Sequence, residues 1–468
     1  MILEMDFIKS EITGVYGNTV LQEMAEILTY YEAYDGNLSV EADVENEDYE
    51  PSIKKVNYIK KLIKEEARFL LGCTPNISLI TEDEEAQTYL DKVLEDNLFA
   101  DKLVKAGRDA FIGKRVALKL NLIGQGDKQR VGITFAPSLE FVYEPSLEDE
   151  SELDKIIFFY TAKEHEEKSE QRIWRQKYEM IDGKCYLTEG LYDGEGNPID
   201  VKYDVADTGL NFIPCYVLLN DGLSGDTGES DVADLISIQE NINKMSSQDL
   251  DALLKGMNEI TYGIDIDNNA IQHFKNKAGA FWDVVTEPTK RDSKAEIGLL
   301  SKSFSYDSRI ENALNRMKSE MHELLNIPEV DSSSLQGSLT SAKAMRALYW
   351  SLMNRCEEKW SQWCPMLKWM ARAIMEISEV YGLYHIGTDY SVEVENNYPI
   401  PDDTIDEMTA DLQQVNSEAM SRMSFFKKWR NNSDEEALAE LKQIAYEKKL
   451  LEDMYGLDFD TNNEQEEI

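Results

Sequence analysis

The sequence has few of the residue types on which most active sites depend. Only four histidines, His165, His273, His322 and His385, occur among 468 residues, and no two have the helical spacing of metal ligands. The chain also lacks the G-x-x-x-x-G-K-[ST], H-E-x-x-H, G-x-S-x-G and Rossmann glycine motifs. The sequence gives no positive indication of catalysis, and we expect no catalytic, cofactor-binding or metal-binding residues.

One segment imitates the start of an EF-hand calcium loop, with Asp265, Asp267 and Asn269 at alternate positions. The sixth position is Ala270 instead of glycine, and the twelfth is Asn276 instead of glutamate. Such a loop lacks both the sharp turn and the bidentate ligand that calcium requires. We interpret the segment as a polar turn at the end of a strand.

Cysteine pairs and long apolar runs are also missing. The five cysteines are an odd number without CxxC spacing, which favours reduced thiols in a cytosolic protein. The first ten residues include Glu4 and Asp6 and have no apolar core, so no signal peptide is predicted. Apolar runs such as 156–160 fall far short of the ~18 residues of a membrane span. We expect a soluble intracellular protein.

Positive charge is scarce. The chain has 48 Lys and Arg against 90 Asp and Glu, a formal net charge of −42, yet its 42% hydrophobic and 10% aromatic content is that of a globular protein. Because phosphate binding depends on Lys and Arg clusters, this balance argues against wrapping nucleic acid or binding an anionic membrane. It leaves open a protein that lets DNA pass without binding it tightly.

The first half of the chain changes from helical to strand texture. Helices are predicted within 1–40, over 53–69 and around 84–105, with a solvated acidic connector at 41–50. From 114 to 220, β-branched and aromatic residues become frequent, as in strands. The strands are expected at 119–123, 130–135, 155–162, 172–181 and 215–219.

Two amphipathic helices are predicted next, at 235–257 and 305–327, with Ser230 or Asp231 suited to cap the first. Their polar faces are expected to meet water. The apolar stripes expected to pack these helices contain Leu235, Ile238, Ile242, Met245 and Leu253 in the first and Ile310, Leu314, Met317 and Met321 in the second.

The segment 258–304 between these helices alternates like a small sheet. Ile260, Tyr262 and Ile264 alternate with polar residues, which predicts a strand. A partner strand is predicted at 280–285, through Phe281, Trp282 and Val284. The arrangement is that of a two-helix stalk with a β-rich tip.

A polar loop at 331–338 leads into the longest helix, predicted over 340–382. Pro365 lies inside it and predicts a kink near 361–365. A strand at 390–395 and shorter helices around 403–422 and 433–455 complete the pattern, before an acidic tail.

Three groups of short motifs follow one another along the chain. They are Tyr30-Tyr31 with Gly36-Asn37, then Phe212-Ile213-Pro214 with Leu219-Asn220 and Ser230-Asp231-Val232, then Leu325-Asn326-Ile327-Pro328 with 340–346. In order and spacing they resemble the portal proteins of tailed bacteriophages, of the type found in phage SPP1. The resemblance extends from Tyr30 to about Tyr381. This chain has Ser341-Ala342 where the family usually has Ser-Gly.

The resemblance implies an α+β, mainly helical portal fold. Its parts would be a wing (1–234, with the long kinked helix and returning strand at 341–401), two stem helices (235–257 and 305–327), a small β-containing clip (258–304), a tunnel loop (328–340) and a helical crown with an acidic tail (402–468). It also implies a non-enzymatic ring of twelve copies at one capsid vertex of the virion, assembled in the host cytoplasm. The implied partners are the major capsid and scaffolding proteins, the terminase large subunit, then the head–tail adaptor, and double-stranded DNA passing through the channel without sequence specificity.

Two segments could contact that DNA. The tunnel-loop residues expected to face it are Ser332, Ser333, Ser334, Gln336, Gly337, Ser338, Thr340 and Lys343. The basic residues of the crown, Arg422, Lys427, Lys428 and Arg430, either meet DNA or pair with acidic neighbours in the ring. Likewise, the net charge of −42 either repels the phosphate backbone from the channel wall or only keeps the protein soluble.

Two other classes of protein remain as alternatives. One is another phage head structural protein, such as a minor head or connector protein, which a native mass measurement would separate. The other is an enzyme that uses Asp and Glu without one of the motifs above, which a turnover screen would detect.

Overall fold

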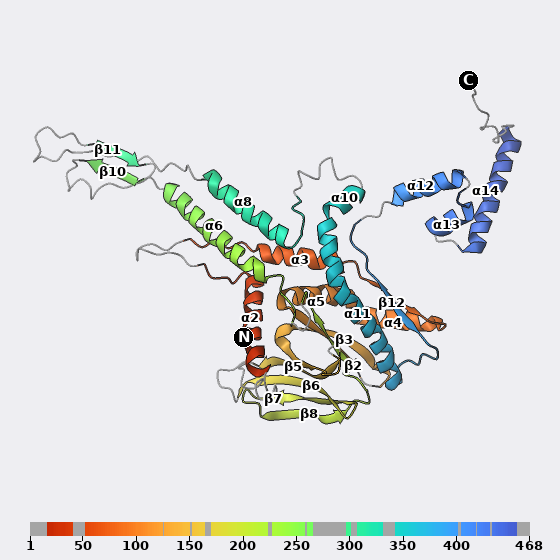
Figure 1. The fold of residues 1–468 in the computed structure, drawn as a ribbon, viewed down its shortest axis with the longest axis horizontal. Coiled ribbons are helices and arrows are strands. Elements are labelled where there is room, and N and C mark those ends of the chain that lie inside the picture. The colour runs from red at the N-terminus through yellow and green to blue at the C-terminus, as the bar shows by residue number, and fades with distance from the viewer. Residues whose placement is uncertain are drawn as a thin grey trace, which may run out of the picture. The chain divides into compact units, whose positions relative to one another are not determined.

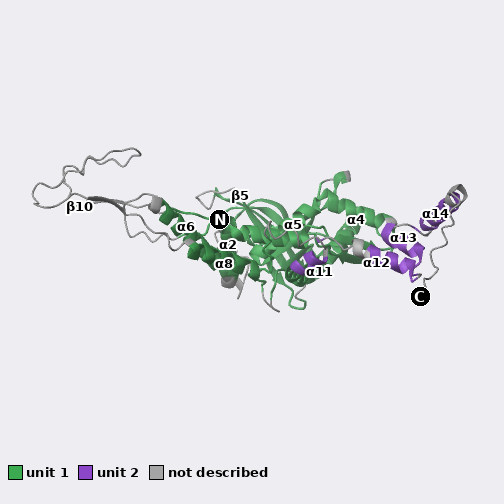
Figure 2. Cartoon of the chain, turned by 90° about the horizontal axis from the view of Figure 1, so that it is seen from above, with its two compact units in different colours: residues 1–330, 349–399 green, residues 331–348, 400–468 purple. Residues whose placement is uncertain are grey.

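The computed structural model describes residues 16–40, 52–124, 126–149, 152–163, 170–222, 227–257, 260–264, 296–300, 307–330, 342–400, 404–417, 419–430 and 433–455. The chain divides into two compact units (Figure 2). Unit 1 comprises Met1–Val330 and Tyr349–Pro399, and unit 2 comprises Asp331–Leu348 and Ile400–Ile468. Unit 1 mixes helices and sheets, whereas the elements described in unit 2 are helices. The expected combination of helix and sheet is therefore confirmed.

Four helices form the N-terminal part of unit 1 (Figure 1). They are α2 (Tyr16–Asp35), α3 (Tyr58–Leu71), α4 (Glu84–Asp96) and α5 (Phe99–Gly113). Helices α3 and α5 pack closely because Gly107 has no side chain: a Cβ there would lie 2.6 Å from Leu71 Cδ1. The apolar side chains of α3, among them Ile59, Leu62 and Ile63, are completely or almost completely buried.

The strands of unit 1 form antiparallel sheets (Figure 1). The larger one has five strands in chain order: β4 (Phe141–Pro145), β5 (Leu153–Lys163), β6 (Arg172–Ile181), β7 (Lys184–Tyr192) and β8 (Pro198–Asp207). A three-stranded sheet has the order β3 (Arg130–Pro137), β2 (Arg115–Ile123), β9 (Cys215–Leu219). Strand β1 (Asn76–Ile80) pairs with the distant β12 (Ser391–Glu395).

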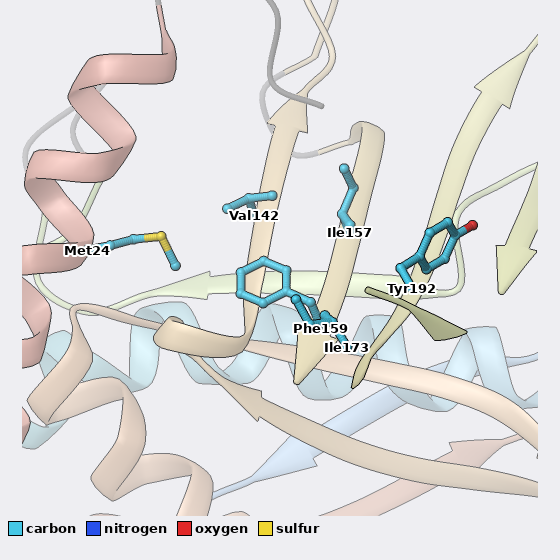
Figure 3. Close-up of a cluster of buried hydrophobic side chains, with 6 residues drawn as sticks. All are labelled: Met24, Val142, Ile157, Phe159, Ile173 and Tyr192. Atoms are coloured by element: carbon cyan, nitrogen blue, oxygen red, sulfur yellow. The ribbon is translucent and has the colours of Figure 1, made fainter. Parts of the chain in front are cut away.

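One apolar cluster packs α2 onto the five-stranded sheet (Figure 3). Met24 of α2 lies against side chains of β4, β5, β6 and β7, all at most 7% exposed. Ile156 and Phe158, which alternate with Ile157 and Phe159 along β5, are also at most 2% exposed, so this strand is covered on both faces. The other members of the cluster are Val142, Ile157, Phe159, Ile173 and Tyr192.

After β9 the chain forms the short 3-10 helix η4 (Ala233–Leu235) and then α6 (Ile236–Met257). Strands β10 (Ile260–Ile264) and β11 (Glu296–Leu300) pair antiparallel, and α8 (Asp307–Leu324) follows and packs against α6. The two helices predicted to flank a small β element are thus confirmed. Strand β10 pairs with Glu296–Leu300, with Ile260 opposite Leu300. The partner strand predicted at 280–285, through Phe281, Trp282 and Val284, lies outside the described residues.

The long helix is divided into α10 (Ala342–Leu348), in unit 2, and α11 (Trp350–Val380), in unit 1. A continuous helix from 340 is therefore wrong: the interruption falls at Tyr349, whose ring stacks on Phe69 at a centroid distance of 5.5 Å. Helix α11 runs through Pro365 without a break. Unit 2 also contains α12 (Thr404–Asn416), α13 (Arg422–Arg430) and α14 (Asp434–Tyr455).

Two further predictions fail for identifiable reasons. The helix predicted over 84–105 is two helices, because the buried Asn97 donates to the carbonyls of Val93 and Val131 and accepts from the amide of Ile133. Those bonds tie the end of α4 to β3. The helix predicted from 53 begins only at Tyr58, where the Asn57 side chain accepts from the amide of Lys60 and caps it.

The stability of unit 1 is expected to depend on pH through Asp109 of α5, which lies 3.4 Å from the hydroxyl of Tyr31. Burial raises the pKa of this carboxyl from 3.8 to about 6. Because the pKa of Asp109 is higher in the folded than in the unfolded state, the protonated carboxyl favours folding. This contribution to stability is complete below pH 3.8 and is lost as the pH rises through about 6. We expect Asp109→Asn to be more stable than the wild type at pH 8, by up to about 3 kcal/mol. Urea unfolding at pH 4.5 and 8 measures this, and an equal difference at both pH values would contradict it.

Candidate functional site

Helix α6 carries a ladder of polar side chains, Gln239, Asn243, Ser247 and Asp251, spaced four residues apart. It faces residues 52–58, the segment that leads into α3, which we call the strap. Four helical residues advance ~6.0 Å and two extended residues advance ~6.6 Å. Successive side chains of the ladder therefore face successive alternate amides of the strap, at residues 58, 56, 54 and 52. The strap runs antiparallel to α6.

Six hydrogen bonds join the ladder to the strap, and all of them reach main-chain atoms of the strap. The Nε2 of Gln239 donates to the carbonyl of Val56 at 2.6 Å, and the hydroxyl of Ser247 lies 3.3 Å from the carbonyl of Lys54. The other four run from Ser52 N to Asp251 Oδ1 (2.8 Å), Lys54 N to Ser247 Oγ (2.9 Å), Val56 N to Asn243 Oδ1 (3.0 Å) and Tyr58 N to Gln239 Oε1 (2.9 Å).

The ladder limits the expectation that the polar side chains of α6 meet water: Asn241, Lys244 and Gln248 are exposed as expected, whereas most of the ladder is buried. Gln239 and Asn243 are each 2% exposed and Ser247 is 6% exposed. A polar side chain is buried at low cost only when its hydrogen bonds are made, and the strap supplies the partners. The position of α6 is therefore fixed by polar contacts on one face and by apolar contacts with α8 elsewhere.

A second polar feature lies between α3, α11 and the chain preceding η4. It consists of Glu66 on α3, Asp221 and Asp231, and Arg355 and Lys359 on α11, which together we call the charge cluster. The side chains of Glu66, Asp231 and Lys359 are at most 4% exposed. Since a buried charge is tolerated only when it is paired, this cluster fixes α11 against α3.

Lys359 is the centre of the cluster. Its ammonium lies 4.3 Å from the centroid of the Phe111 ring, which is a cation–π contact. Its polar contacts are with Asp231 Oδ2 at 2.8 Å, Asn220 Oδ1 at 2.8 Å, Asp221 Oδ2 at 3.0 Å and Glu66 Oε1 at 3.7 Å. Arg355 donates to Glu66 Oε1 at 2.8 Å and to Asp231 Oδ1 at 2.6 Å.

Burial and charge act in opposite directions on these groups. Burial raises the pKa of Glu66 and the adjacent Asp231 carboxylate raises it further, against the effect of Lys359 and Arg355. Burial alone would lower the pKa of Lys359, but the Asp231, Glu66 and Asp221 carboxylates outweigh it and raise that pKa. Lys359 therefore stays charged, and removing it would leave carboxylates without their counter-charge.

The motif around Asn220 and Asp231 has a structural explanation. The amide of Asp231 donates to the carbonyl of Phe111 at 2.9 Å, and Ser230 Oγ donates to that of Ile112 at 2.6 Å. These bonds hold the Asp231 carboxylate against Lys359. The predicted cap on the following helix is wrong for Asp231, because its carboxylate binds Arg355 and Lys359 instead.

The helix-packing residues are only partly buried. In the first helix Leu235 and Ile242 are buried, Ile238 and Met245 are half-buried, and Leu253 is 42% exposed. In α8, Met321 is buried, while Ile310, Leu314 and Met317 are half-buried. The apolar stripe is thus covered where α6 begins and α8 ends, and open at the other end of the pair.

The predicted DNA-facing residues are mostly not described. Ser332, Ser333, Ser334, Gln336, Gly337, Ser338 and Thr340 lie outside the described residues, and Lys343 lies in α10. In β10, Ile260, Tyr262 and Ile264 are strand residues, and Ile264 is 51% exposed.

The basic residues of α13 contact acidic residues of their own unit. Lys428 Nζ and Trp429 Nε1 both donate to Asp411 Oδ2, at 2.7 and 2.9 Å. Arg430 donates to Glu440 at 2.8 Å. These contacts pack α13 against α12 and α14. A contact of Arg422, Lys427, Lys428 or Arg430 with DNA or with a neighbouring copy stays a prediction.

No group of three or more metal-ligating side chains occurs in the described part of the chain. Within the same residues, no helix combines the length and apolarity needed to cross a membrane.

The model of the phage portal protein family, SPP1 Gp6-like, matches residues 16–450. Among solved structures, a chain in the neck of a native GTA particle, computed with C12 symmetry, is similar. The similarity covers 78% of this chain and 88% of that chain, at 12% sequence identity and a TM-score of 0.43. No curated protein sequence matches the chain.

Nearly the whole chain therefore falls within a class of phage head proteins that are structural and not enzymatic. It belongs to the SPP1 Gp6-like family of phage portal proteins, and its role is that of a portal. A phage portal is a component of the virion. The resemblance found in the sequence is confirmed.

Proposed function

We propose that twelve copies of this chain form a ring around a channel for double-stranded DNA at one vertex of the capsid. Helices α6 and α8 form the stem and β10–β11 belong to the clip at its tip. Residues 328–340 form the tunnel loop, with 1–234 and 341–401 as the wing and 402–468 as the crown. The terminase large subunit docks on the clip during packaging and the head–tail adaptor docks there afterwards.

The observation that carries this proposal is the way α6 is held. It packs against α8, it is fixed on its polar face by the strap, and the chain between the two helices contains the β10–β11 pair. A helix pair anchored at one end and joined by strands at the other is a rigid stalk. A ring of such stalks provides a channel wall of constant width.

The exposed apolar residues of the stem support a ring of neighbours. Leu253 and Leu254, near the end of α6, are 42% and 45% exposed. Large apolar side chains that are exposed together usually mark a surface that another chain covers. In the ring, the stem helices of adjacent copies cover these leucines.

The scarcity of basic residues suits DNA that must slide. Only 48 Lys and Arg occur against 90 Asp and Glu, and Lys428 and Arg430 already pair with Asp411 and Glu440. A channel wall of this composition forms few phosphate contacts, so the DNA is not held in place. The serine-rich loop at 332–338 touches it sterically and through hydroxyls.

Native mass measurement of the purified protein, together with negative-stain images, tests the proposal. We expect particles of about twelve copies of 53.6 kDa with a central hole. A species that remains monomeric at high concentration and in the presence of scaffolding protein would contradict it.

A further inference from the structure

Unit 1 contains a cavity that none of the parts discussed above uses. Its volume is about 760 Å³, and it lies between β2, the strands β6 to β8 and the end of α11. Its wall mixes aromatic and aliphatic side chains with polar ones, and the charged residues in it are Lys119, Glu189, Lys202 and Asp207. The residues that matter here are Lys119, Trp174, Gln176 and Tyr203.

Lys119 of β2 is a buried cation in this wall, only 9% exposed. Its ammonium donates to Gln176 Oε1 at 2.9 Å and lies 4.7 and 5.0 Å from the ring centroids of Phe158 and Trp174. No carboxylate oxygen of the described residues lies within 4 Å of it, because Glu189 pairs with Lys202 instead. Burial lowers the pKa of Lys119, and the nearby Glu189 and Glu140 carboxylates oppose this shift without reversing it.

On the side of β8, the edge strand of the five-stranded sheet, the cavity is lined by Lys202, Tyr203, Ala206 and Asp207. Alternate side chains of this strand, Ile199, Val201, Tyr203 and Val205, are between 42% and 51% exposed. An edge strand with a row of exposed apolar side chains invites another chain. Glu189 pairs with Lys202 and Asp207 with Lys184, so Lys119 is the cation of the wall that a negatively charged group next to an apolar side chain would meet.

The loop between β4 and β5 presents that combination. Leu147 is 100% exposed, and it is followed by Glu148 and Asp149. The loop is closed by a hydrogen bond from Ser146 N to the carbonyl of Glu152 at 2.9 Å, and Glu148 N donates to Ser146 Oγ at 3.4 Å. A leucine held fully in solvent on a closed loop is a projecting apolar knob.

The knob and the cavity lie at different places on one sheet. The knob is at the end of β5 where Lys155 pairs with Glu179, whereas Trp174 of the cavity wall lies five residues, or roughly 17 Å, further along β6. A chain cannot fill its own cavity with its own loop across that distance. If the loop of each copy instead enters the cavity of the next copy, two different surfaces meet at every contact. Such head-to-tail contacts form a closed ring when the rotation between copies allows it.

We infer that Leu147 and Glu148 of one copy insert into the cavity of the next copy, with the Glu148 carboxylate beside Lys119. This inference rests on the proposed ring and assigns one of its contacts between wings. The occupant is a second copy of the chain, chosen by its charge and shape complementarity to the cavity.

Cross-linking of the full-length protein tests the contact. Leu147→Cys combined with Tyr203→Cys is treated with a short bismaleimide and run on a denaturing gel. We expect most chains in a ladder of covalent multimers that extends to the closed ring. The matched control pairs Ile80→Cys, whose native residue is 51% exposed in unit 1, with the same Tyr203→Cys and should give no ladder. The two single variants report the background from the native cysteines.

A second variant separates this contact from the ring itself. Leu147→Ser changes a side chain without buried contacts, so its unfolding midpoint should equal that of the wild type, while its ring fraction in native mass spectra should fall at least tenfold. Ile80→Ser should change neither. Wild-type rings without the cross-link, and unaltered ring formation by Leu147→Ser, would overturn the inference and leave the proposed function intact. A wild-type protein that never forms rings would contradict both.

Discussion

Replacing Lys359 by methionine should lower the free energy of unfolding of unit 1 by about 3–5 kcal/mol. The substitution keeps the length of the side chain but removes the charge that faces Asp231, Asp221 and Glu66. Two of these carboxylates are almost completely buried, so water cannot take the place of the ammonium. Urea unfolding followed by the fluorescence of the buried Trp363, on the same helix, measures the effect.

Lys105→Met is the matched control for that experiment. Lys105 forms an ion pair with Asp101 at 2.6 Å, but both side chains are more than 60% exposed. Exposed pairs contribute little, so this variant should lie within about 0.5 kcal/mol of the wild type. A Lys359→Met protein as stable as the control would show that the charge cluster does not fix α11.

The double substitution Gln239→Leu with Asn243→Leu should release the strap from α6. It removes the acceptors for the amides of Val56 and Tyr58 and the donor to the carbonyl of Val56. At about 1 kcal/mol for each net hydrogen bond, the free energy of unfolding should fall by about 2–4 kcal/mol. Hydrogen exchange provides the specific readout, since the Val56 and Tyr58 amides should lose at least tenfold in protection.

Asn241→Leu, on the same helix, controls for the change from amide to leucine. Asn241 is exposed and bonds only within its own helix, to the carbonyl of Ser237 at 2.9 Å. Strap amides should keep their protection in this variant. If the double variant also left the strap amides protected, the ladder would not be what holds the strap to α6.

Much of the fold could be predicted from local patterns. Strands β6 and β9 have the predicted bounds, because β-branched and aromatic residues are frequent in both. The helices α6 and α8 followed from apolar residues at a spacing of three and four. Strands β7 and β8 were not predicted. The cause in β8 is visible, since each of its residues from 198 to 205 is exposed and its charged residues resemble a loop.

The strap could not be predicted because its partner is about 190 residues away. Ile53, Val56 and Ile59 are three residues apart and imitate a helix, but the ladder of α6 competes for the amides that a helix would use. Gln239 and Asn243 are polar helix residues whose partners lie far away in the sequence, so the local pattern does not distinguish them from residues that face water. Polar residues at a spacing of four carry no sign of whether water or a distant main chain satisfies them.

The charge cluster has one signal in the sequence. Lys359 lies three residues after Cys356 and four before Trp363, both buried, so it interrupts the apolar stripe of the long helix. A lone cation at such a position implies buried carboxylates nearby. The sequence cannot say which of the 90 acidic residues supply them, because Glu66 and Asp231 are brought to α11 only by the tertiary structure.

Recognition of the strap through its main chain has a consequence for sequence variation in this protein. The ladder contacts main-chain amides and carbonyls. The side chains of residues 53 and 55 can therefore vary, provided that no residue is inserted into or deleted from the strap. For the contact with the strap, the constraint falls on the side chains of α6. A single insertion or deletion between Gln239 and Asp251 would rotate part of the ladder by about 100° and leave it facing away from the strap. Divergent relatives should therefore differ freely at positions 53 and 55 while keeping the Asn57 cap of α3 and the number of residues in α6.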